Sequence, residues 1–182
     1  MEKTEFFAIN THILKDVCGE YNIKLDGDKI HYNGVEYTYL SSGLCREVYR
    51  SECGKWVLKI PIGDFPETPE FIDYRTLHNL LEYSAYINCP NELKKYFAYT
   101  ELLDYGWLKQ EYVDVFDFKH SPSLRELGKR PTDASVCVFD FDPVIDFVIR
   151  QYRCDFDFCF SETAKRHFNY TVADFIKETF KC

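Results

Sequence analysis

Apolar and polar positions alternate in short runs through the first third of the chain, and turn residues separate these runs. In residues 21–40 the turn signals Asp26-Gly27-Asp28 and Asn33-Gly34 divide the alternation into segments typical of consecutive β-hairpins. Two further strands are expected over 45–53 and 55–62. This part of the sequence therefore predicts an antiparallel sheet.

Helical spacing of apolar residues replaces the alternation at several points along the chain. Helices are expected over 4–19, 70–87, 92–97 and 142–154, the last with Pro143 in its first turn. Strands are expected over 98–106 and 107–115, a looser polar connection over 119–135, a hairpin over 157–175 and a frayed end beyond it. Strands thus dominate the first half and helices the second, a pattern that predicts an α+β fold.

Composition narrows the class of protein. The 182 residues are 46% hydrophobic and 18% aromatic, which is enough apolar material for a folded core. The net charge of -8 argues against nucleic acid as a partner. No signal peptide or membrane span is apparent, so the expected location is the cytoplasm, where the eight cysteines would remain reduced thiols.

Lys59 is out of place in the apolar run Trp56–Ile62. An unpaired ammonium group that is buried costs several kcal/mol, so the residue requires either solvent or a partner. One interpretation places Lys59 on an open sheet face or at an edge. The other depends on the next elements of the chain, which are a helix that carries Glu82 and then two strands that end in "QEYVDV".

This order of elements resembles the N-terminal lobe of the protein kinase superfamily. In that family a strand lysine binds the nucleotide phosphates and pairs with a helix glutamate. "WVLK" stands where the family has V-A-I-K, which implies that Lys59 is the phosphate-binding lysine. Glu82 in "NLLEYSAYINCP" matches the paired glutamate, and Glu70 is the alternative. The resemblance thus implies a kinase-like N-lobe, an antiparallel sheet with one packed helix.

The resemblance also implies where a nucleotide would contact the chain. The phosphate-covering pattern G-x-G-x-x-G-x-V falls on Ser41, Gly43, Arg46 and Val48, so the middle glycine and the valine are retained. Arg46 would either supply charge to the phosphates or block them. In "WLKQEYVDV" the family's gatekeeper position falls on Gln110, and backbone groups from Glu111 to Val113 would face an adenine ring.

Several acids in the C-terminal part match the family's catalytic positions. "TVADF" resembles the strand that delivers the metal-binding Asp of D-F-G, here Asp174. In "YRCDFDF" Asp155 is the candidate base and Asp157 replaces the metal-binding Asn. A second alignment makes Asp157 the base and leaves Ser161 or Glu162 near the Asn position. No H-R-D motif is present, and no large substrate-binding lobe follows Asp174.

Together these features imply a lobe over 1–114 followed by a reduced helical and hairpin subdomain over 115–182. The expected function is that of a degenerate, pseudokinase-like protein with ATP and Mg²⁺ as ligands, which acts mainly through a protein partner. An origin in a phage or another mobile element fits this description. One alternative is an active minimal protein kinase that transfers the γ-phosphate to a protein hydroxyl. Another is an unrelated acidic α+β interaction or inhibitor domain.

Overall fold

The computed structural model describes residues 23–26, 28–43, 46–61, 74–103, 106–116, 127–152, 154 and 156–180. The helix expected over 4–19 lies outside these residues. The chain divides into two compact units, of which one comprises Met1–Asn79 with Glu101–Glu111 and the other Leu80–Thr100 with Tyr112–Cys182.

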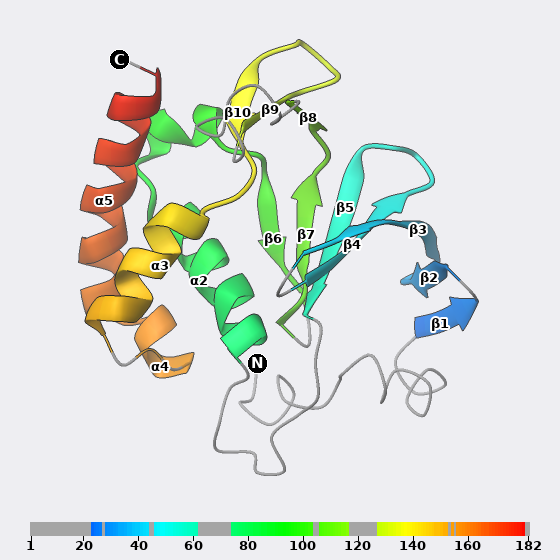
Figure 1. Ribbon diagram of the computed structural model, residues 1–182, viewed down its shortest axis with the longest axis horizontal. Coiled ribbons are helices and arrows are strands. Elements are labelled where there is room, and N and C mark those ends of the chain that lie inside the picture. Colours follow the sequence, from blue (N-terminus) through cyan, green and yellow to red (C-terminus); the bar gives the residue numbers. More distant parts are fainter. Residues whose placement is uncertain are drawn as a thin grey trace. The chain divides into compact units, whose positions relative to one another are not determined.

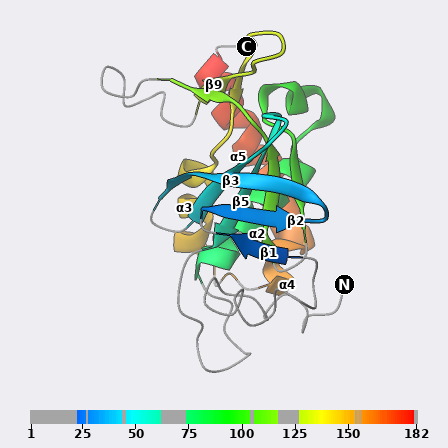
Figure 2. The same ribbon diagram turned by 90° about the vertical axis from the view of Figure 1, so that its right-hand side faces the viewer.

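Seven strands form a sheet in the order β1-β2-β3-β4-β5-β7-β6 (Figure 1). The strands are β1 (Ile23–Asp26), β2 (Lys29–Tyr32), β3 (Val35–Ser42), β4 (Arg46–Ser51), β5 (Trp56–Pro61), β6 (Thr100–Leu102) and β7 (Leu108–Glu111). Each pairing from β1 to β7 is antiparallel, and Figure 2 shows β1, β2 and β3 side by side. The predicted hairpins and α+β class are therefore confirmed.

Local turn chemistry explains the first hairpins. Asn33 and Gly34 connect β2 to β3 with φ of 49° and 76°, the left-handed conformations of a two-residue type I′ turn. Gly54 has φ of 71° in the turn between β4 and β5. One face of the sheet buries a cluster made of Ile30, Tyr32, Tyr37, Tyr49, Leu58, Ile60 and Trp107.

Helix α2 (Tyr74–Asn88) follows β5, and the 3₁₀ helix η2 (Asn91–Tyr96) follows α2, both close to their predicted ranges. Beyond β7 the chain forms a second sheet in the order β10-β9-β8, from β8 (Asp114–Val115), β9 (Leu127–Lys129) and β10 (Val136–Val138). The sequence did not predict β9 and β10. Arg130 fixes this region through hydrogen bonds of 3.1 Å to the Lys95 carbonyl and 2.6 Å to the Phe97 carbonyl.

Three helices complete the second unit: α3 (Asp142–Gln151), α4 (Phe156–Cys159) and α5 (Glu162–Phe180). Helix α3 agrees with the prediction. The expected hairpin over 157–175 and the frayed end after it are wrong, because α4 and α5 occupy this part of the chain. Helix α5 buries one residue every four positions, namely Ala164, Phe168, Val172 and Ile176. That spacing aligns them on one helical face, and their burial favours the helix over a strand.

Candidate functional site

Lys59 lies in the interior of the larger sheet and is 4% exposed. The four central residues of β5, from Val57 to Ile60, are all buried, so neither face of this strand is open to solvent. Lys59 pairs across the sheet with Val48 of β4 on one side and Leu108 of β7 on the other. Directly opposed residues share a face of the sheet, so the lysine and the valine matched to the kinase pattern are neighbours. The open-face interpretation of Lys59 is therefore wrong.

Asn79 of α2 connects this helix to the backbone of three neighbouring segments. Its Nδ2 donates to the Lys59 carbonyl at 3.1 Å and to the Gly106 carbonyl at 2.8 Å. Its Oδ1 accepts a 3.4 Å hydrogen bond from Nη1 of Arg46. Asn79 is fully buried, and these bonds use both amide hydrogens and the carbonyl oxygen. The Asn79 side chain thus fixes the first half of α2 to β4, to β5 and to Gly106.

The β3–β4 turn is closed by a hydrogen bond of 2.9 Å from the Gly43 amide to the Arg46 carbonyl. Gly43 is exposed, and a Cβ added there would meet no atom within 4 Å. Arg46 is 8% exposed, and its side chain is directed toward Asn79. Arg46, which stands where the kinase pattern would have its third glycine, is therefore part of the packing beneath α2.

The residues expected to face an adenine ring, Glu111 to Val113, lie where the chain passes from one unit to the other. Gln110 is 1% exposed and pairs with Val57, which places the expected gatekeeper on the strand adjacent to Lys59. Glu111 is half-buried and is the last residue of the first unit. Val113 belongs to the second unit, where its side chain packs with Ala98 and Cys137.

Glu82 is fully buried in α2 and belongs to the second unit. It comes three residues after Asn79, so the two side chains lie on one side of the same helix. The alternative glutamate, Glu70, lies outside the described residues.

The acids expected to bind metal are placed differently from the family pattern. Asp174 is half-buried in the interior of α5, so the strand that the resemblance implied over 171–175 is wrong. Asp157 is exposed in the four-residue helix α4, at the start of the segment where a hairpin was expected. Asp155 lies outside the described residues. Among the described residues no group of three or more His, Cys, Asp or Glu side chains is placed to hold a metal ion.

Sequence reasoning missed Asn79. The available signal was a pair of polar residues, Asn79 and Glu82, at helical spacing beside the leucines of the segment "NLLEYSA". Such a pair on the packed side of a helix indicates polar partners in the sheet below it.

No protein-family model matches the sequence, and no curated protein matches it. Within the part of the chain that the structure describes, no helix has both the length and the apolar character needed to cross a membrane.

Proposed function

We propose that the chain is a degenerate, kinase-like protein that binds ATP with Mg²⁺ through Lys59 and acts mainly by contacting another protein. The observation that carries this proposal is the placement of Lys59, buried in a central strand between Val48 and Leu108 with α2 bonded to its carbonyl. The backbone at Lys59 is thus fixed, and in the kinase pattern a lysine at this place in the sheet binds the nucleotide phosphates. Glu82, buried one helical turn beyond Asn79, is the proposed partner of its ammonium group.

A binding role is favoured over phosphoryl transfer. Transfer requires a metal-binding acid and a base in fixed positions near the phosphates. Asp174 lies within a helix and Asp157 is exposed on a single helical turn, so neither has the backbone context from which its role was inferred. The arginine in the phosphate-covering turn is bonded to α2, which restricts the flexibility that two glycines would provide.

Thermal unfolding with and without millimolar Mg-ATP tests the nucleotide part of the proposal. A ligand present at about 100 times its Kd stabilises the folded protein by roughly 2.7 kcal/mol. We expect wild-type protein to be stabilised and Lys59→Met to lose this stabilisation. Lys109→Met is the matched control, because Lys109 lies on the adjacent strand β7, directly opposite Leu58, on the other face of the sheet.

The outcomes separate the two parts of the proposal. If Mg-ATP does not stabilise the wild type, ATP is not a ligand of this protein. The proposed role in protein interaction would then stand alone. Stabilisation that survives in Lys59→Met would place the nucleotide elsewhere. For the metal, we expect Asp174→Asn to be stabilised by Mg-ATP as much as the wild type is. If this variant is no longer stabilised, Asp174 would again be a candidate magnesium ligand.

A further inference from the structure

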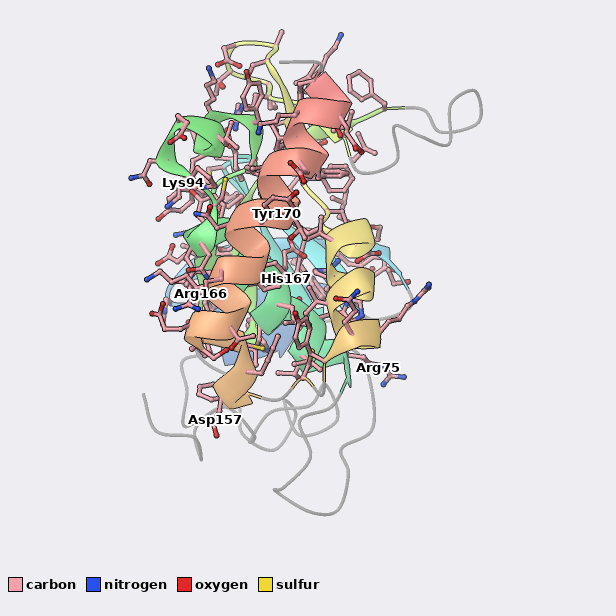
Figure 3. All side chains as sticks on the ribbon, turned by 90° about the vertical axis from the view of Figure 1, so that its left-hand side faces the viewer. Arg75, Lys94, Asp157, Arg166, His167 and Tyr170 are labelled. Carbon is pink, nitrogen blue, oxygen red and sulfur yellow. The ribbon has the colours of Figure 1, made fainter. Side chains whose placement is uncertain are left out.

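The outer side of α5 carries a cation and a highly exposed aromatic residue. Arg166 and Tyr170 are four residues apart and therefore share a face of the helix. This face lies opposite the buried row that includes Phe168 and Val172. Tyr170 is 70% exposed, the largest value among the exposed large hydrophobic residues described, and Figure 3 shows both side chains on the outer side of α5.

The end of α2 adds further apolar and cationic groups beside α5. Nδ2 of Asn169 donates to the Asn88 carbonyl at 3.4 Å, so α5 lies against the end of α2. Ile87, next to Asn88, is 37% exposed. The Tyr86 ring contacts the Tyr99 ring edge-on with centroids 6.0 Å apart, and Nζ of Lys94 lies 5.5 Å from the Tyr86 centroid. The α2–α5 surface is defined here as Tyr86, Ile87, Lys94, Tyr99, Arg166 and Tyr170.

The charge of the α2–α5 surface differs in sign from that of the whole chain. The chain carries a net charge of -8, yet Lys94 and Arg166 form no ion pair with any described residue. Of the nearby acids, Glu162 is already bonded to Lys165 at 3.3 Å, and Glu92 shares η2 with two lysines, Lys94 and Lys95, so η2 keeps an excess of positive charge. At physiological salt the screening length is about 8 Å, so a bound segment experiences mainly these local charges.

Three of the six residues of this surface are tyrosines and one is an arginine. Tyrosine and arginine are enriched in interface cores and among the residues that contribute most to binding energy. We propose that the α2–α5 surface binds an acidic peptide segment of another protein. Carboxylates of the segment would meet Lys94 and Arg166, and an aromatic or aliphatic side chain would pack on Ile87 and Tyr170. The inference rests on the proposed interaction role and does not depend on nucleotide binding.

Fluorescence anisotropy with a labelled random copolymer of glutamate and tyrosine tests this inference. We expect saturable binding that weakens when salt rises from about 0.1 M to about 1 M, which shortens the screening length from about 10 Å to about 3 Å. Reversing both charges with Lys94→Glu and Arg166→Glu should raise Kd about tenfold or more. Tyr170→Ala should raise it about threefold to tenfold.

Lys55→Glu is the control, since it makes the same charge change at an exposed turn of the other unit and should leave Kd unchanged. Circular dichroism establishes that each variant is folded. Equal affinity of wild type and the double variant, or equal binding of a lysine–tyrosine copolymer, would overturn the inference. So would tighter binding of an oligothymidylate, or self-association that the double variant abolishes. The nucleotide experiment is independent, so failure of one leaves the other standing.

Discussion

The side-chain amide of Asn79 donates a 3.1 Å hydrogen bond to the backbone carbonyl of Lys59, so a helix is fixed to the strand residue that matches the kinase lysine. The same amide group bonds the Gly106 carbonyl at 2.8 Å, and both partners lie in the first compact unit. One buried side chain thus bonds α2 both to β5 and to Gly106.

Asn79→Ala is expected to lower the free energy of unfolding by about 2–3 kcal/mol, because two carbonyls beneath α2 lose this donor. Asn88→Ala is the control on the same helix, where Nδ2 of Asn88 bonds the Ser84 carbonyl at the less buried end. Its cost should stay below about 1 kcal/mol. Urea denaturation measures the free energy of unfolding of both variants. Equal decreases would contradict the proposal that the Asn79 hydrogen bonds hold α2 against β5.

The proposed pair of Lys59 and Glu82 predicts energetic coupling. Removal of one partner from a buried ion pair leaves the other charge uncompensated, so a second substitution costs less than the first. In a cycle of Lys59→Met, Glu82→Gln and the double variant, we expect a coupling energy of about 1–3 kcal/mol. Additivity within about 0.5 kcal/mol would show that the two residues do not interact.

Gly128 is required for a close approach between β9 and Val113. A Cβ at this position would lie 2.6 Å from Cγ2 of Val113 and 3.1 Å from the Asp114 carbonyl oxygen. Gly128→Ala should therefore destabilise the protein by about 1–3 kcal/mol in urea denaturation. Part of this loss should be recovered in a Val113→Ala background. Gly43→Ala is the control, since its Cβ meets open space, and a comparable loss there would contradict the steric explanation.

Cys53 is expected to be the most reactive of the described thiols. It is exposed, and a hydrogen bond from Ser51 lowers the pKa of its thiol, with the Lys55 amide adding to the effect. Burial raises the pKa of Cys89 to about 12. Because the thiolate is the nucleophile, iodoacetamide should modify Cys53 first, as read by peptide mass spectrometry. Ser51→Ala should slow this modification, and an unchanged rate would reject the role of the Ser51 hydroxyl.

Half-burial of His167 lowers the pKa of its imidazole below the usual value of about 6.5. Between the lowered pKa of the folded protein and pH 6.5, His167 therefore carries more protons in the unfolded chain than in the folded one. Its contribution to stability is full above about pH 6.5 and is lost as the pH falls through that interval. His167→Gln should flatten this part of the stability profile measured by urea denaturation. A slope identical to that of the wild type would contradict the prediction.

Local signals in the sequence determined much of the first sheet and three of the helices, α2, η2 and α3. Asn33-Gly34 specifies a left-handed two-residue turn by itself, and Pro143 marks the first turn of α3. For the candidate site, the sequence determined the order Val48, Lys59, Glu82 and Gln110 along the chain. The turn and the helix start depend only on residues that are neighbours along the chain, so the sequence alone suffices to predict them.

Tertiary contacts decided the remainder. The resemblance of "TVADF" to the D-F-G strand suggested a strand over 171–175, whereas burial of Val172 with Phe168 and Ile176 stabilises α5 as a helix. The short strands β9 and β10 form because Leu127–Lys129 finds partners in β8 and β10. Both faces of β5 are buried, Lys59 included, and Asn79 bonds to carbonyls that are distant in the sequence. These features arise only when separated segments pack together, because a sequence pattern indicates which face of an element is apolar but not what packs against it.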